Sequence, residues 1–228
     1  MIIIEDLNVS YERGKSVLKD LSLSLPEDNI HGVVGLNGSG KTTLLNTMFG
    51  LKKQDSGTIM YGDNVLNKKD IAYLVTDNYF YPNITGNEYL GLFKNVNFDT
   101  EKWNKVFKLP LDELIENYSS GMKKKLAILG TLKQDKPILI LDEPFNGLDI
   151  ETVRVLREIL LKLKENGKTI IITSHILETL TNLCDYIHYL EGGIILNSKD
   201  KSGFKSFEKE IFNTIKARNR EIIDELKI

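Results

Sequence analysis

The segment at residues 35–42 most constrains what this chain can fold into. It reads Gly-Leu-Asn-Gly-Ser-Gly-Lys-Thr and matches the pattern G-x-x-x-x-G-K-[ST]. An apolar stretch precedes it and an amphipathic stretch at 41–49 follows it, so the sequence predicts a strand, a tight loop and a helix in succession. A glycine-rich turn before an ordinary helix is the alternative, but this flanking strand and helix are the context that a phosphate-binding loop requires.

The backbone and side chains of this loop are suited to binding phosphate groups. Its glycines allow positive φ angles, so successive N–H groups can point at one anion, with the positive end of the following helix behind them. Lys41 would reach the β- and γ-phosphates, and the Thr42 hydroxyl would coordinate Mg²⁺. The predicted nucleotide-binding residues of the loop are Gly35, Leu36, Asn37, Gly38, Ser39, Gly40, Lys41, Thr42 and Thr43.

Length, charge and cysteine content narrow the class of protein. The 228 residues fit one large domain or one domain with a small insert. The formal net charge of −2 argues against nucleic-acid binding, which usually needs a basic surface. Cys184 is the only cysteine, so no disulfide can form within the chain, and a reducing compartment fits. No apolar run approaches the roughly 20 residues of a membrane span, and the N-terminus lacks a signal-peptide pattern, so we expect no membrane-spanning segment.

Two strands are predicted before the phosphate loop, at about 2–11 and 17–25. Apolar and polar residues alternate in the second from Leu21 onward, which is typical of a half-buried strand. The short turn between them favours antiparallel pairing. Tyr11 lies near the end of the first strand. It is either a half-exposed aromatic of the sheet or a flat ring that stacks on a nucleotide base, and the residues alone leave both open.

The pattern changes to helix after predicted strands at 57–62 and 71–75. Apolar residues recur three and four apart at about 87–93 and 100–107, and Asp99 or Thr100 would cap the second helix. We therefore predict a helical insert at about 77–132 within an α/β core. Its aromatic side chains form either the core of this insert or a docking face for a partner, and they are Tyr79, Phe80, Tyr81 and Trp103.

Residues 119–129 predict the start of a further helix. Ser119, Ser120 and Gly121 are suited to its N-terminus, and apolar residues recur after them. Hydroxyl groups and free N–H groups at a helix N-terminus also make a second anion site. The three lysines at 123–125 are expected on a solvated face of the helix.

Two acidic residues follow a buried strand. Residues 137–141 form a continuous apolar run, typical of the centre of a parallel sheet, and Asp142 and Glu143 come directly after it. In an open α/β sheet the carboxyl ends of the strands bind the ligand. Asp142 is suited to Mg²⁺, directly or through water, and Glu143 is suited to act as the general base on an attacking water. A surface turn is the alternative, against which the phosphate loop argues.

The rest of the chain continues the alternation of helix and strand. A helix at about 151–165 follows Asp149, and a strand at 168–173 leads to His175. This histidine is either a hydrogen-bonded structural residue or a partner of Glu143 at the γ-phosphate. A helix at 176–183 and strands at 185–190 and 194–197 follow. An amphipathic tail of one or two helices at about 204–228 has apolar residues at helical spacing, namely Phe204, Phe207, Ile211, Phe212, Ile215, Ile222, Ile223 and Leu226.

In this order the motifs resemble those of the nucleotide-binding subunit of ATP-binding cassette (ABC) transporters, over almost the full chain. Residues 35–42 resemble Walker A, and residues 138–142 with Glu143 resemble Walker B and the catalytic glutamate. Residues 119–122 stand where the signature sequence of the family would, and 147–149 look like its D-loop. The order of these motifs is more specific than any one of them.

His175 looks like the switch histidine of the family, and Tyr11 looks like its adenine-stacking aromatic. The resemblance implies a single ABC ATPase domain over 1–228, of the P-loop NTPase class. Such a domain has a mainly parallel sheet, an N-terminal antiparallel β-subdomain and a helical insert. The sequence of residues 74–90 and 121–126 is most similar to that of bacterial exporters of the antibiotic-resistance or bacteriocin-immunity kind.

The resemblance also implies ATP, Mg²⁺ and two kinds of protein partner. Two copies would form a head-to-tail homodimer, in which each ATP lies between residues 35–43 of one copy and residues 119–121 of the other. A separate transmembrane permease would hold the dimer on the inner, cytoplasmic face of the membrane. Glu143 and His175 would act in catalysis, and Thr42 and Asp142 would hold the metal.

Two positions depart from the family pattern. Ser120 replaces the first glycine of the signature, which keeps a small side chain but restricts φ. Thr76 stands where the family usually has a glutamine that touches Mg²⁺ and the attacking water. A threonine is too short for that geometry, so either the neighbouring Asp77 compensates or the coupling of hydrolysis to the membrane partner is altered.

Two other functions remain open at this point. A soluble cassette ATPase that acts on ribosomes or DNA usually has two cassettes, long coiled-coil inserts or a basic surface, and this chain has a single phosphate loop and a net charge of −2. A regulatory ATP-binding subunit with weak turnover is suggested by Thr76.

Overall fold

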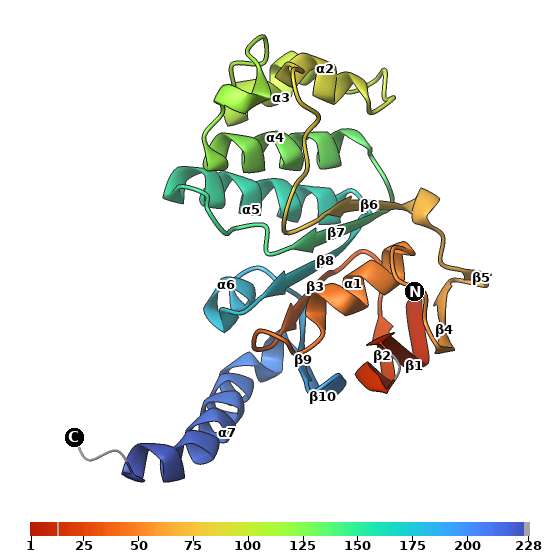
Figure 1. The fold of residues 1–228 in the computed structure, drawn as a ribbon, viewed down its shortest axis with the longest axis vertical. Helices are drawn as coiled ribbons and strands as arrows, with labels where there is room; N and C mark the ends of the chain where they lie inside the picture. Colours follow the sequence, from red (N-terminus) through yellow and green to blue (C-terminus); the bar gives the residue numbers. More distant parts are fainter. Residues whose placement is uncertain (13, 226–228) are drawn as a thin grey trace.

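The computed structural model describes residues 1–12 and 14–225, with two sheets and the helices around them (Figure 1). The first sheet has four antiparallel strands in the order β2-β1-β4-β5. These strands are β1 (Ile2–Glu12), β2 (Lys15–Leu25), β4 (Ser56–Tyr61) and β5 (Asn64–Val65). The antiparallel pairing expected for the first two strands is confirmed, and β5 is an addition that the sequence pattern did not predict.

The second sheet has six strands in the order β10-β9-β3-β8-β7-β6. They are β3 (Ile30–Val34), β6 (Ile71–Leu74), β7 (Ile138–Asp142), β8 (Thr169–Ser174), β9 (Tyr186–Glu191) and β10 (Ile194–Asp200). All neighbours are parallel except β9 and β10. The expected mainly parallel sheet is therefore confirmed. β3, β7 and β8 are buried along their whole length, which explains their continuous apolar sequences.

The helix α1 (Lys41–Phe49) packs between the two sheets. Its Leu44 and Leu45 share one core with the first sheet and with Ile138 and Ile140 of β7. The alternate residues of β7 face a second core, which is covered by the remaining helices. The period of two in the strand thus places one set of side chains on each face of the six-stranded sheet.

Three helices lie together on the far side of this sheet (Figure 1). They are α2 (Gly86–Gly91), α3 (Thr100–Phe107) and α4 (Ser120–Lys133). The Asp99 side chain accepts a hydrogen bond from the N–H of Lys102, so Asp99 and not Thr100 caps α3. The Ser119 hydroxyl accepts one from the N–H of Met122 and caps α4. Each of these two side chains thus satisfies one of the free N–H groups in the first turn of its helix.

The aromatic residues of this region divide between the two predicted roles. Phe80 and Trp103 are half-buried and pack against the core, where Trp103 stacks on Phe98. Tyr79 and Tyr81 are 76% and 58% exposed, and their rings meet edge to face. Only the two tyrosines are therefore available to a partner.

The remaining helices are α5 (Ile150–Glu165), α6 (Leu177–Thr181) and α7 (Phe204–Glu225), and short 3₁₀ turns lie at Lys68–Asp70, Ile115–Asn117 and Lys201–Gly203. The tail is one helix, which projects from the body of the molecule (Figure 1). Phe204, Phe207 and Ile211 are buried, whereas Phe212 is exposed. The side chains predicted apolar at 215, 222 and 223, and Leu226 itself, lie outside the described residues. Within the described part, no helix has the length and apolar character to span a bilayer.

Candidate functional site

The loop between β3 and α1 is held in a shape that only glycine permits at two points. Gly38 and Gly40 have φ angles of +79° and +110°. At Gly35, an added Cβ would lie 2.3 Å from the Leu190 carbonyl oxygen and 2.6 Å from the Ser39 hydroxyl oxygen. No larger residue fits there, so the close approach of the backbone requires glycine.

A buried hydroxyl in this loop has no partner. The Ser39 Oγ atom is shielded from solvent and makes no hydrogen bond among the described residues. An unpaired buried donor is costly unless a ligand satisfies it. Together with the backbone shape, this orphaned hydroxyl fits a loop that receives an anion such as a phosphate group.

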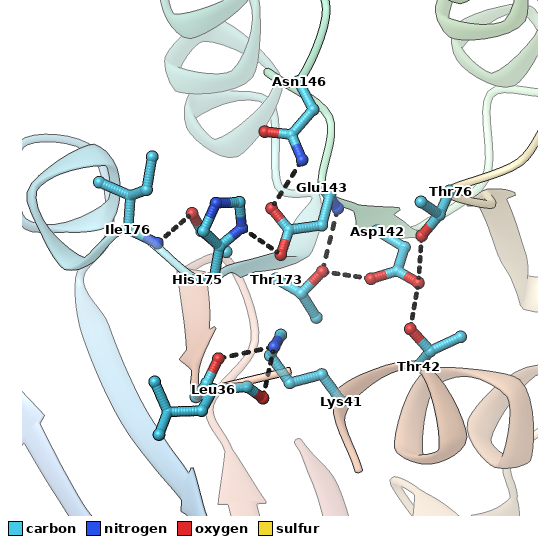
Figure 2. Close-up of polar contacts among 12 residues, drawn as sticks. Leu36, Lys41, Thr42, Thr76, Asp142, Glu143, Asn146, Thr173, His175 and Ile176 are labelled. Carbon is cyan, nitrogen blue, oxygen red and sulfur yellow. Dashed lines mark hydrogen bonds and ion pairs between the residues drawn. The ribbon is translucent and has the colours of Figure 1, made fainter. Parts of the chain in front are cut away.

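Lys41 is 93% buried at the same loop, with only 7% of its surface exposed. Its ammonium donates to the Gly35 carbonyl at 2.6 Å and to the Leu36 carbonyl at 3.2 Å (Figure 2). Burial lowers the pKa of Lys41, and the nearby carboxylates of Glu143 and Asp142 oppose that shift. The ammonium therefore rests on loop carbonyls, from which a long and mobile side chain can move to a phosphate oxygen.

Asp142, the last residue of β7, is fully buried and receives three hydroxyl groups (Figure 2). Its Oδ2 atom accepts from Thr42 and from Thr76, each at 2.8 Å. Its Oδ1 atom accepts from Thr173. Three donors satisfy a carboxylate that would otherwise be expensive to bury. Thr42 belongs to the phosphate loop, so the predicted pair of metal-binding residues lies together.

The donor set fits Mg²⁺ that is bound chiefly through a substrate. Among the described residues, no group of three or more His, Cys, Asp or Glu side chains could hold a metal ion. Mg²⁺ characteristically takes one or two protein oxygens and fills its octahedron with water and phosphate oxygens. A single carboxylate beside a hydroxyl at the phosphate loop is that kind of site.

Glu143 is held between two polar side chains (Figure 2). Its Oε1 atom lies 3.1 Å from the Nδ1 atom of His175, and its Oε2 atom accepts from the Asn146 amide at 3.3 Å. The backbone of Glu143 has a φ of +49°, and its N–H donates to the Thr173 hydroxyl at 3.0 Å. Residues with such strained backbone angles cluster at functional sites. The strain turns the carboxylate out of the strand and toward the cavity.

A cavity of about 520 Å³ joins these groups. It is lined by the loop residues Asn37, Gly38, Gly40, Lys41, Thr42 and Thr43, together with Asp142, Glu143 and His175, and by Val17, Thr76 and Asn146. Sequence reasoning did not predict Val17, Asn146 or the hydroxyl of Thr173 as part of the site. A signal for Thr173 is its position, since it lies directly opposite Asp142 in the register of β7 and β8.

Three predicted loop residues, Gly35, Leu36 and Ser39, do not line this cavity, and neither do four predicted residues outside the loop. Tyr11 is 54% exposed, and the Lys52 ammonium lies 4.6 Å from the centre of its ring. Ser119, Ser120 and Gly121 lie at the start of α4, where Ser120 lines a different cavity. The stacking of Tyr11 on the adenine and the contact of Ser119, Ser120 and Gly121 with the nucleotide of a second copy stay predictions.

Known proteins are similar to this chain in sequence. A family profile described as ABC transporter matches residues 18–146. The lantibiotic transport ATP-binding protein SrtF of Streptococcus pyogenes is 31% identical, with 93% of this chain and 96% of that protein covered. The bacitracin transport ATP-binding protein BcrA of Enterococcus faecalis is 32% identical, with 84% of this chain and 67% of that protein covered.

Solved structures have the same fold. The structure of an ATP binding subunit of an ABC transporter is 26% identical and superposes with a TM-score of 0.83, which covers 91% of this chain and 93% of that one. A dimeric structure of a post-hydrolysis state of the ATP-binding cassette MJ0796, bound to ADP and Pi, has a TM-score of 0.78 at 22% identity, with 88% and 99% covered.

Proposed function

This chain belongs to the ABC transporter family as an ATP-binding and ATP-hydrolysing member, and we propose that it drives export through a separate membrane-spanning partner by ATP-dependent dimerisation. The observation that carries the proposal is the hydrogen bond from the Thr42 hydroxyl to the Asp142 carboxylate. It brings the phosphate loop to within hydrogen-bond distance of the strand end that presents Glu143. One cavity thus offers groups for the phosphates, the metal and the attacking water.

The loop residues would bind the triphosphate, and Lys41 would move from its loop carbonyls to the β- and γ-phosphates. Thr42 and Asp142 would hold Mg²⁺, which neutralises charge on the phosphate oxygens when it is bound. The three hydroxyl groups on Asp142 keep its carboxylate in one orientation for that purpose. The protein therefore contributes mainly position and charge, as is typical of phosphoryl transfer.

Glu143 would act as the general base. It takes a proton from the water that attacks the γ-phosphorus, while the bond to the bridging oxygen of ADP breaks. His175, at 3.1 Å from Glu143, would orient this carboxylate and donate a hydrogen bond near the γ-phosphate. Asn146 fixes the other carboxylate oxygen.

The dimer would complete each ATP site. The cavity of one chain is open, so the γ-phosphate would remain half-solvated within it. The start of α4 in a second copy, at Ser119, Ser120 and Gly121, can close over the nucleotide in a head-to-tail pair. The structure of the MJ0796 cassette is dimeric, which supports this arrangement. Tyr11 would stack on the adenine once the Lys52 ammonium has moved away from the face of its ring.

A membrane permease is the partner that the relatives support. SrtF and BcrA are described as transport ATP-binding proteins for a lantibiotic and for bacitracin. By analogy, the chain would lie on the inner face of the membrane and would export a compound of the antibiotic or bacteriocin class. The single domain at 1–228, with its helical insert at about 77–132, would transmit the dimer motion to the permease.

Two variants test the assignment of the ATP site. Lys41→Ala should lose ATP binding. Glu143→Gln should bind ATP, hydrolyse it at least about 100-fold more slowly, and accumulate as an ATP-bound dimer that size-exclusion chromatography resolves. Hydrolysis by Glu143→Gln at the parental rate would show that Glu143 is not the base.

Affinity capture from detergent-solubilised membranes tests the partner. We expect a protein with several membrane spans, encoded beside this chain. Recovery of ribosomes and no membrane protein would contradict the transporter role and favour the soluble alternative.

Thr76 favours a second candidate, a regulatory subunit with weak turnover. Its hydroxyl donates its hydrogen to Asp142 at 2.8 Å. If this is the function, Thr76→Gln should raise the turnover sharply. An unchanged or lower turnover would exclude it.

A further inference from the structure

The second of three consecutive lysines on α4 is buried without a partner. Lys125 forms an ion pair with Asp149 at 2.8 Å, and Lys123 is half-buried. Lys124 has only 9% of its surface exposed, and among the described residues its ammonium makes no hydrogen bond or ion pair. The prediction of a solvated face at 123–125 is therefore wrong for Lys124. Burial lowers the pKa of Lys124, and the nearby carboxylates of Asp142, Glu143 and Asp77 oppose that shift. None of them contacts the ammonium, so it is free to bind a ligand in the adjacent cavity.

Lys124 lines a second cavity, of about 300 Å³. This cavity lies on the other side of Glu143 from the phosphate loop, because the two cavities share Thr76, Glu143 and Asn146 in their linings. The remaining lining residues are Asp77, Asn78, Phe80, Ser120, Lys123 and Gly147. The two cavities therefore adjoin each other at Glu143.

The groups around the second cavity select a small anion. Two ammonium groups, the amides of Asn78 and Asn146 and the hydroxyl of Ser120 all offer hydrogen-bond donors. The helix α4, which has 14 residues, also begins at this wall and directs the positive end of its dipole there. Asp77 and Glu143 balance the two lysines, so the empty cavity is close to neutral. The buried ammonium disfavours a metal ion.

We propose that this cavity binds the inorganic phosphate that hydrolysis releases, with Lys124 as its principal contact. The phosphate leaves by this route while ADP stays on the phosphate loop. The inference rests on the proposed hydrolysis of ATP, since that reaction supplies the phosphate. It places the control of phosphate release on α4, the helix whose start is predicted to meet the second copy.

Product inhibition of steady-state hydrolysis by added phosphate tests the site. The chain should be inhibited by inorganic phosphate in the millimolar range. Lys124→Met keeps the length of the side chain and removes its charge, and it should need about tenfold more phosphate for the same inhibition. Lys124→Arg should restore the inhibition. Lys105→Met is the matched control, because Lys105 is an exposed lysine of the neighbouring helix α3 and lines neither cavity.

A binding measurement separates this inference from the proposed function. Thermal melting with saturating ADP and increasing inorganic phosphate needs no turnover, and ADP occupies the part of the loop that holds the α- and β-phosphates. The comparison with Lys124→Met then separates the second cavity from the γ-phosphate position. Phosphate should raise the melting temperature of the ADP-loaded parent and should have little effect on Lys124→Met. Absent hydrolysis with an intact phosphate shift would overturn the proposed function alone. No phosphate shift in the ADP-loaded parent, or an equal shift in Lys124→Met, would overturn the phosphate site.

Asn78→Leu is a second test of the phosphate site, which does not depend on the folding of Lys124→Met. Asn78 lines only the second cavity, so its change should weaken phosphate inhibition in the same direction as Lys124→Met. If Lys124→Met does not fold, unchanged phosphate inhibition in Asn78→Leu overturns the inference.

Discussion

Thr173 connects the carboxylate that we propose for the metal, Asp142, to the one that we propose as the general base, Glu143. Its hydroxyl is fully buried, donates to Asp142 and accepts from the N–H of Glu143. One side chain therefore fixes both the orientation of Asp142 and the strained backbone of Glu143. Nothing in the local sequence Thr-Ser-His marks this threonine as different from any other strand residue.

Thr173→Val should disable this connection with little change in volume. The free energy of unfolding should fall by about 1–3 kcal/mol, because Asp142 and Glu143 each lose a buried hydrogen bond. ATP hydrolysis should fall about 100-fold, since a small misplacement of catalytic groups has that effect. Urea unfolding measures the change in stability, and a phosphate-release assay measures the rate of ATP hydrolysis. Thr173→Ser is the control, and equal activity of the Val and Ser variants would count against the role.

A pair of buried histidines joins β3 to β9. His31 Nε2 donates to the Pro26 carbonyl at 2.8 Å, since a carbonyl can only accept. Its Nδ1 must then accept from His188 Nε2 at 3.3 Å, and His188 Nδ1 accepts from the Ser198 hydroxyl at 2.8 Å. This assignment of tautomers satisfies all four ring nitrogens with both rings neutral. Burial lowers the pKa of His188 from 6.5 to about 3 and lowers that of His31 as well.

The stability of the protein should consequently fall in mild acid. The unfolded chain binds protons at these histidines below pH 6.5 and the folded chain does not, so the stability present above that pH is lost as the pH falls toward 3. His188→Gln should flatten the slope of unfolding free energy between pH 6.5 and 5 by up to about 1.4 kcal/mol per pH unit. Urea titrations across that range measure it. Parallel curves for parent and variant would exclude this account.

The helix α4 links the insert to the catalytic sheet through close packing. Gly130 faces α2, and an added Cβ would lie 2.7 Å from a Phe93 ring carbon and 2.9 Å from a Tyr89 ring carbon. The ring of Tyr89 also contacts Phe80 and Phe93, at centroid distances of 5.0 and 5.3 Å. The glycine thus lets a helix that begins at the predicted second anion site lie against the aromatic core of the insert.

Gly130→Ala should separate packing from helix propensity. A crowded core costs about 1–3 kcal/mol, which exceeds the gain of about 0.5–1 kcal/mol that alanine brings to a helix interior. Gly91→Ala is the matched control, because Gly91 ends α2 and has no atom within 4 Å of an added Cβ. Thermal melting should show a loss for the first variant and none for the second. Equal stability would mean that the aromatic rings move aside freely.

Among the residues that the structure describes, Tyr79 and Tyr81 form one exposed pair of contacting aromatic rings, at the entry to the predicted insert. Both tyrosines follow β6 in the chain. Between them and the strand lies Thr76, whose hydroxyl donates to Asp142. A partner seated on the pair would therefore sense the state of the ATP site through a few residues of chain. Large exposed aromatic side chains are favoured anchors at interfaces.

The double variant Tyr79→Ser with Tyr81→Ser should bind the membrane partner at least about tenfold more weakly. Its ATP-dependent dimerisation, measured in the Glu143→Gln background, should be unchanged. Val96→Ser is the control, since Val96 is the most exposed large hydrophobic residue between α2 and α3. Capture of the permease at the parental level by the double variant would exclude this docking face.

Local patterns were sufficient for most of the fold and for half of the site. The loop at 35–42, the acids after β7 and the caps at Asp99, Ser119 and Asp149 are short-range features, which the physics of glycine, burial and helix termini determines within a few residues. The order of strands and helices follows from periods of two and 3.6. The same chemistry predicted Glu143 beside His175, although 32 residues separate them.

Only the tertiary structure decided how distant groups share these roles. The hydroxyls on Asp142 come from positions 100, 66 and 31 residues away, and no local pattern selects one threonine over another for such a contact. Consecutive residues of a helix point in different directions, so which of three adjacent lysines is buried depends on the elements packed around α4. The sequence alone predicted the phosphate loop and its chemistry. The packing of β6, β7, β8 and α4 decided which side chains complete the site, because burial and long-range contact are properties of the assembled chain.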